Sequence, residues 1–252
     1  MNEVLSRLAD LVPARARRLL AVFPHPDDES YGLAGTLAKL GDDPDAAAVL
    51  MTLTRGEAAT AGLEEGLTPA QQGERRSERM RRVAEILRLD ALLLRDEPDR
   101  RLAYVDPRPI ERDVAAVVEA FRPQVVVTFG PRGINAHPDH IATHWIVKRV
   151  ALEARERSGG TTAARLATMT VPASVAAGID RPLFARPDDA IDAVLDVSPW
   201  AEQKEACLRI HEAYLTVTGA EGLHHRPPVE TLMLWGEPPA RPPLGDLFER
   251  RP

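Results

Sequence analysis

Four ionisable side chains stand within five residues in the stretch His25-Pro26-Asp27-Asp28-Glu29. They follow directly on an apolar run, residues 19–23, which has the composition of a buried strand. A turn needs only one or two polar residues, so an imidazole beside three carboxylates indicates that a cation is held there.

A second group of the same kind, His137-Pro138-Asp139-His140, follows the apolar run 125–130. Each group alone has a simpler interpretation, as a turn with an acidic helix cap. Together they offer His25, Asp28, His137 and His140, the ligand types of a catalytic zinc ion that keeps one open position for water. Two such groups at the ends of neighbouring strands predict a metal site.

Alternating strand and helix patterns surround both groups. Strands are predicted at 19–23, 47–54, 91–94 and 125–130, and helices follow them at 31–40, 70–88, 109–121 and 139–156. Apolar strands in this alternation predict an α/β fold with a mostly parallel sheet covered on both faces, a three-layer sandwich. In such a sheet ligands bind at the carboxyl ends of the strands, near the point where the strand order reverses.

The rest of the chain extends this single domain, residues 1–252. A short amphipathic helix is expected before the first strand, and further strands are expected at 167–171, 192–197 and 231–235. The proline-rich end, from about residue 237, is predicted to be a surface tail.

Composition narrows the class of protein. The net charge is −6, and the arginine-rich stretch 74–82 mixes in acids at helical spacing, which indicates a solvated helix rather than a nucleic-acid surface. No apolar run reaches the ~18 residues of a membrane span. The single cysteine, Cys207, excludes an intramolecular disulfide and a multi-cysteine metal site, and is expected to be a small buried side chain. Without a secretory signal pattern, the expected location is cytoplasmic.

The two motifs HPDDE and HPDH, in this order, resemble those of the LmbE-like, or PIG-L, zinc-dependent deacetylases. Thr54-Arg55-Gly56-Glu57 is similar to the family's TRGE segment, and the helix with Arg75 and Glu78 to its R-x-x-E helix. The segment 196–211 is similar to the family's DVS…K…A…H segment. The resemblance covers about residues 18–215 and implies a Rossmann-like fold.

The resemblance also implies a set of roles. It assigns one Zn2+ per chain, with Fe2+ or Co2+ as substitutes, to His25, Asp28 and His140. It makes Asp27 the general base and His137 the stabiliser of the oxyanion. Adjacent aspartates on a sharp turn point in different directions, so one can bind metal while the other takes a proton from water. Either Asp27 or His137 can return that proton to the leaving amine.

Further residues are expected around the substrate, a small acylated amino sugar or glycoside. The resemblance makes Arg55 a ligand of substrate hydroxyls and Asp99 a contact of the sugar. Asn135 stands where some relatives carry a tyrosine, and its amide can donate a hydrogen bond. Asp139 is expected to favour a cationic His137 by Coulomb attraction. The chain is also compatible with a homo-oligomer.

Two other functions remain open at this stage. Two histidines and one carboxylate also form the site of non-haem iron(II) oxygenases, and a binding module could retain the fold without activity. An aspartate beside the metal ligand favours hydrolysis, and neither the base nor any ligand is missing. We therefore predict an N-deacetylase acting on linear amides.

The remaining polar residues of these motifs have structural interpretations. Glu29 is expected to support the turn rather than to bind metal. His144 is expected to pack, His211 to lie at the rim of the site, and His224 and His225 to be exposed.

Overall fold

The computed structural model describes residues 2–59, 66–157, 164–180, 182–211, 228–239 and 241–249. Within them one sheet has seven strands, β1 (Arg17–Phe23), β2 (Ala46–Thr54), β3 (Ala91–Glu97), β4 (Val125–Phe129), β5 (Arg165–Met169), β6 (Ala193–Asp196) and β7 (Val229–Trp235). The helices are α1 (Asn2–Ala14), α2 (Asp28–Gly32), α3 (Ala34–Gly41), α4 (Pro69–Ile86), α5 (Pro107–Phe121), α6 (Gly133–Ala136), α7 (Pro138–Arg157), α8 (Ala173–Ala176) and α9 (Ala201–Ile210). Two 3-10 turns, η1 (Asp188–Ala190) and η2 (Ser198–Trp200), flank β6.

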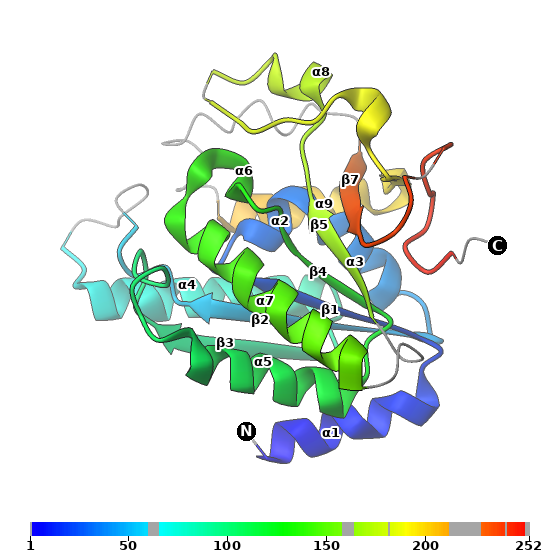
Figure 1. The fold of residues 1–252 in the computed structure, drawn as a ribbon. Coiled ribbons are helices and arrows are strands. Elements are labelled where there is room, and N and C mark those ends of the chain that lie inside the picture. Colours follow the sequence, from blue (N-terminus) through cyan, green and yellow to red (C-terminus); the bar gives the residue numbers. More distant parts are fainter. Residues whose placement is uncertain are drawn as a thin grey trace.

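The strand order is β3-β2-β1-β4-β5-β7-β6. The chain first builds outward from β1 to β2 and β3, then returns to place β4 on the other side of β1 (Figure 1). Pairing is parallel from β3 to β5, and β7 runs antiparallel to both its neighbours. The strand order therefore reverses between β1 and β4, which places their carboxyl ends side by side.

Both faces of the sheet are buried, as the apolar strands require. Alternate side chains of β1 enter different cores: Leu19 and Phe23 lie in one, Leu20 and Val22 in the other. The first core lies under α3, α4 and α9, and the second under α1, α5 and α7, the last two of which cross in front of the sheet in Figure 1. This confirms the predicted three-layer α/β sandwich.

Two expectations about the elements are corrected. The helix predicted at 31–40 is two helices, because Leu33 leaves the helical conformation at φ −145° between α2 and α3. The C-terminal segment is not simply a surface tail. Leu244 and Leu247 are buried in the first core, and Leu244 bridges to Ala193 of β6.

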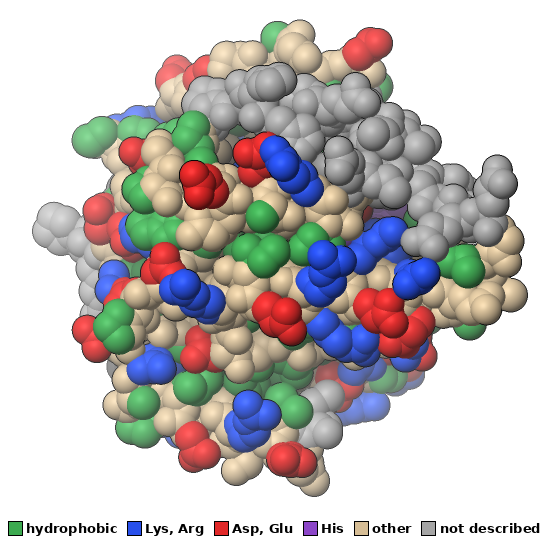
Figure 2. Space-filling model, turned by 180° about the vertical axis from the view of Figure 1, so that it is seen from behind, with side chains coloured by type: hydrophobic (Ala, Val, Ile, Leu, Met, Phe, Trp, Pro, Cys, Tyr) green, Lys and Arg blue, Asp and Glu red, His purple; other side chains and the backbone are tan. Residues whose placement is uncertain are grey.

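On the face seen in Figure 2, acidic and basic side chains of the described residues lie intermixed, and neither sign of charge dominates it. Along α4, acidic and basic side chains pair: Arg75 contacts Glu78, and Arg81 contacts Glu74. Among the helices that the structure describes, none is long and apolar enough to cross a membrane.

Candidate metal and catalytic site

The loop after β1 is fixed by the end of β2. Both the amide and the hydroxyl of Thr54 donate to the carbonyl of Pro24, at 2.9 and 2.8 Å. Further along this loop, Asp27 adopts a φ of 113°, a backbone conformation that residues other than glycine rarely adopt. Such a backbone persists where surrounding contacts hold it, and it turns Asp27 and Asp28 in different directions.

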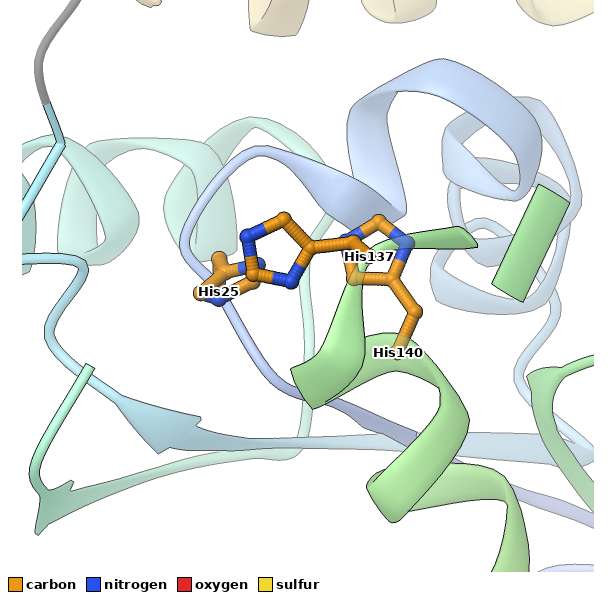
Figure 3. A group of neighbouring side chains, drawn as sticks. All are labelled: His25, His137 and His140. Carbon is orange, nitrogen blue, oxygen red and sulfur yellow. The ribbon is translucent and has the colours of Figure 1, made fainter. Parts of the chain in front are cut away.

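Three imidazoles meet at the switch point of the sheet. His25 comes from the loop after β1, His137 immediately precedes α7, and His140 lies in the first turn of α7 (Figure 3). The ring centre of His25 lies 4.7 Å from that of His137 and 5.2 Å from that of His140. The two motifs, more than a hundred residues apart in sequence, thus form one site.

The carboxylate of Asp28 lies between two of these rings. Its Oδ2 is 3.5 Å from Nδ1 of His25, and its Oδ1 is 3.4 Å from Nε2 of His140. Burial lowers the pKa of His140 to about 4, so this ring is neutral, as a metal ligand must be. The structure therefore brings the predicted ligands His25 and His140 to opposite oxygens of Asp28, and the binding of a metal by these three residues remains a prediction.

The opposite nitrogens of the two rings are held by the protein. Nε2 of His25 lies 3.2 Å from Asp139 Oδ2 and 3.1 Å from Asp99 Oδ1. Nδ1 of His140 lies 3.0 Å from the carbonyl of Gly133, whose φ of +61° and contact with the His140 Cβ leave no room for a side chain. These bonds turn His25 Nδ1 and His140 Nε2 towards Asp28, the arrangement by which proteins orient metal-binding histidines.

The charge around His25 indicates that the site requires a cation. Burial lowers the pKa of His25, but hydrogen bonds to Asp139, Asp28 and Asp99 outweigh it, so the pKa is raised well above its ordinary value. Without a metal, a proton on His25 would partly balance three carboxylates. A divalent cation held by His25, Asp28 and His140 supplies this positive charge, so the donor set fits such an ion.

Other donor combinations overlap with this set. Among the described residues, potential ligand atoms lie within 4.8 Å of one another in the groups His25/His137/His140 and His25/Asp99/Asp139. The oxygens of Asp139 are already occupied, because they also accept the amides of Arg100 and Leu102 at 2.6 and 3.0 Å. Asp139 therefore supports His25 from behind.

Asp27 points away from Asp28 and towards α4. Its Oδ2 lies 3.3 Å from Nη2 of Arg76, and its amide donates to Glu29 Oε2 at 3.2 Å. Burial raises the pKa of Asp27 to about 8, with Arg76 opposing and Asp28 adding to the shift. Glu29 is fully buried and supports the turn, as expected.

His137 differs from the expected cation. Burial and the nearby charge of His25 lower its pKa, and its Nδ1 accepts the amide of Asp139 at 3.2 Å. A neutral ring that accepts at Nδ1 carries its proton on Nε2. His137 can therefore act as a hydrogen-bond donor without being charged.

Of the three residues expected to contact the substrate, two line the cavity and one does not. Asp99 and Asn135 line the cavity above the histidines, and Asn135 Oδ1 accepts the amide of His137 at 3.1 Å. Arg55 is not among the lining residues. It pairs with Asp96 at 2.9 Å and Glu74 at 3.4 Å, so its contact with substrate remains a prediction.

Sequence reasoning missed Arg76. The guanidinium is buried, donates to the carbonyls of Gly56 and Pro26, and reaches Asp27. Its neighbour Arg75, the arginine singled out in the R-x-x-E pattern, is exposed and contacts Glu78. The available signal was spacing, because Arg76 falls on the buried stripe of α4 with Gln72, Met80 and Val83.

The other histidines are mostly accounted for by packing. His144 is buried against Trp145 and Trp235 and its Nδ1 bonds to the carbonyl of Phe129, which confirms its structural role. His211 does not lie at the rim. It is buried, with Nε2 3.6 Å from Glu29. His224 and His225 lie outside the described residues.

A cavity of about 310 Å³ opens above this site. His25, Asp27, Asp28, His137 and His140 all lie on its wall, and Figure 3 shows the three histidines beside one another. The volume is at the lower end of the range for small-molecule sites. The arrangement can therefore hold a metal ion, a base and a hydrogen-bond donor around one reacting group of a ligand.

Comparisons with known proteins agree with this site. Residues 20–151 match the family described as "PIG-L: GlcNAc-PI de-N-acetylase". A 1D-myo-inositol 2-acetamido-2-deoxy-alpha-D-glucopyranoside deacetylase of Mycobacterium sp. (strain KMS) is 32% identical over 247 residues, covering 83% of this chain and 77% of that protein.

Two solved structures share the fold at low identity. The N,N'-diacetylchitobiose deacetylase of Pyrococcus horikoshii has a TM-score of 0.65 at 16% identity, covering 92% of this chain and 90% of its own. GalB, the 4-carboxy-2-hydroxymuconate hydratase of Pseudomonas putida, has a TM-score of 0.61 at 19% identity, covering 86% and 95%. Because a deacetylase and a hydratase both have it, the fold alone does not determine the reaction.

Proposed function

Because the chain belongs to the PIG-L family, we propose that it is a metal-dependent amidohydrolase that removes an N-acyl group, acetyl in most relatives, from a small molecule containing a 2-amino sugar. The observation that carries this proposal is the divergence of two adjacent carboxylates. Asp28 faces His25 and His140, whereas Asp27 faces Arg76. Hydrolysis needs both a metal ligand and a free base, and the pair supplies one of each.

His25, Asp28 and His140 would hold the ion, and we propose Zn2+ because it favours imidazole and carboxylate ligands in catalytic sites. A divalent metal at this position would polarise the amide carbonyl and lower the pKa of a water molecule towards ~7. Asp139 and Asp99 contact Nε2 of His25, which would leave its Nδ1 to bind the ion.

The remaining steps belong to the chain's own side chains. Asp27 takes a proton from the attacking water. Its carboxylate is oriented by Arg76, and its backbone by the hydrogen bond that the Asp27 amide donates to Glu29. His137 donates its Nε2–H to the carbonyl oxygen as negative charge develops there. Breaking the C–N bond requires a proton for the leaving amine, and either Asp27 or His137 would deliver it.

On the substrate side, Asp99 and Asn135 line the cavity and would contact the sugar. The mycobacterial relative is named for an acetamido sugar linked to inositol, and we propose a glycoside of this general class as substrate. We propose the cytoplasm as the site of action.

The test combines metal content with amine release. The purified chain is depleted of metal, reloaded with one equivalent of Zn2+, Fe2+ or Co2+, and assayed with N-acetylglucosamine and with the acetamido glucoside of inositol. We expect about one ion per chain, and release of one acetate with each amine. Failure to bind any of the three ions, or full activity after metal removal, would contradict the proposal.

A further inference from the structure

The wall of the cavity is polar at one end and apolar at the other, with the reacting groups between. We propose that this chain prefers an acyl group longer and more apolar than acetyl, seated against the apolar wall. The inference rests on the proposed function, since it assigns a site to one of the two products of amide hydrolysis.

The polar end lies over the ends of β1, β2 and β3. Arg76 arrives from α4, and Asp99 and Arg100 from the loop that follows β3. The carboxylate of Asp99 is buried, with Oδ1 3.1 Å from Nε2 of His25. Arg76 and Asp99 also bond within the protein. Their charged groups line the cavity and can share hydrogen bonds with the hydroxyl groups of an amino sugar.

The apolar end lies over β4 and β5, on the other side of the switch point. Its wall includes Met169, Val171, Val175, Ile179 and Leu183. These residues come from β5 and the residues just after it, and from α8 and the segment that follows, and Figure 1 shows α8 beyond the carboxyl end of β5. Val175 and Ile179 are only half-buried, so their side chains retain apolar surface to cover.

Polar residues at this end are bonded within the protein. Lys204 Nζ donates to Glu230 at 2.6 Å, and the same carboxylate accepts the amides of Gly35 and Thr36, both at 2.9 Å. The Thr231 hydroxyl donates to the carbonyl of Thr170 at 2.9 Å. A sugar placed here would lose its hydrogen bonds to water and gain few in return.

The amide of the substrate joins an amine side and an acyl side, and we assign each side to the end of the cavity that matches its polarity. The amide carbon must lie among Asp27, His137 and the metal ligands, at the boundary between the two ends. The hydroxyl-bearing amine side matches the polar end. The acyl side then extends over the apolar wall, where an acetyl methyl would cover little of it and a chain of several methylenes would cover more.

The volume of the whole cavity limits how much of the sugar and of the acyl group it can bury together. Its volume of about 310 Å³ equals that of roughly ten water molecules in bulk water. Burial of each methylene favours binding about fourfold, so three or four buried methylenes would raise kcat/KM roughly 100-fold over acetyl.

The experiment compares acyl groups on one sugar. Acetyl, butanoyl, hexanoyl and octanoyl amides of the glucosaminyl inositol are assayed for amine release with the metal-loaded enzyme. Binding of acetate, butanoate and octanoate is measured by calorimetry as a readout that does not depend on turnover. We expect kcat/KM to rise from acetyl to octanoyl, and octanoate to bind more tightly than acetate.

A matched pair of variants locates the subsite. Val175→Trp fills the apolar wall, whereas Ala177→Trp adds the same side chain at an exposed position that does not line the cavity. We expect Val175→Trp to lower the octanoyl-to-acetyl ratio of kcat/KM at least tenfold, and Ala177→Trp to leave it unchanged. The ratio is internal to each preparation, so partial misfolding does not alter it.

The outcomes separate the inference from the function. Amine release that is fastest from the acetyl amide, or a ratio unaffected by Val175→Trp, overturns the acyl inference and leaves the deacylase function standing. No release from any amide by the metal-loaded protein overturns the proposed function, and the inference with it.

Discussion

Nε2 of His25 lies 3.2 Å from Oδ2 of Asp139, a residue 114 positions further along the chain. The contact joins the two sequence motifs, because Asp139 belongs to the HPDH group and His25 to the HPDDE group. It also determines which nitrogen of His25 is free. With Nε2 held by Asp139 and Asp99, Nδ1 is the atom directed at Asp28.

Asp139→Asn tests this relationship. The amide keeps the shape of the carboxylate but loses its charge and one acceptor, so His25 is held less firmly. We expect metal affinity to fall 10–100-fold, the usual cost of losing such a support, as measured by competition with a chelator. Thermal unfolding of the metal-free variant serves as the control for folding, and unchanged affinity would show that Asp139 does not orient His25.

Asp27→Ala separates the base from the ligands. Asp27 faces Arg76 rather than the two histidines, so we expect the variant to retain one metal ion per chain while kcat falls by about 10²–10⁴. Elemental analysis and amine release measure the two effects on the same sample. Turnover near the wild-type rate would refute the role of Asp27.

His140→Ala and His137→Ala form a matched pair on one short segment. His140 contacts Asp28, so its removal should release the ion. His137 is placed as a hydrogen-bond donor, so its removal should leave the ion bound and lower kcat by about 10²–10³. Full metal occupancy in His140→Ala, or a loss of only twofold in His137→Ala, would contradict the respective assignment.

Arg76→Lys tests the residue that the sequence motifs did not reveal. A lysine cannot reach Asp27 and the carbonyls of Pro26 and Gly56 together, so Asp27 loses its fixed orientation. We expect kcat to fall roughly 10²-fold and the free energy of unfolding to fall by about 1–3 kcal/mol, because buried acceptors are left unpaired. Arg75→Lys, at an exposed neighbouring position, is the control and should change neither quantity.

Cys207 should be inert in the folded protein. It is fully buried, and burial together with the charge of Glu29 raises the pKa of its thiol. Because the thiolate is the reactive form, we expect Ellman's reagent at pH 8 to react far more slowly with the native chain than with the denatured one. Equal rates in both states would show that the thiol is accessible.

Much of the fold could be predicted from local pattern. Apolar runs such as the one at β2 mark strands buried on both faces, and their alternation with helices implies a parallel sheet. The C-terminal segment was misjudged because Leu244 and Leu247 stand among prolines without any regular period. Only the sheet to which they return makes them part of the core.

By itself, the sequence determined which ligand types are present, and that an aspartate stands beside Asp28, the predicted metal ligand. Residue types and short spacings are properties of the chain, and HPDDE and HPDH carry them directly. The tertiary structure alone decided which atoms face each other. Arg76 rather than Arg75 reaches Asp27, Asp139 contacts His25 across 114 positions of sequence, and apolar side chains from β5 and α8 line the cavity. Such contacts depend on how the strands and helices pack, because a helix turns by 100° per residue and places neighbours in sequence on different faces.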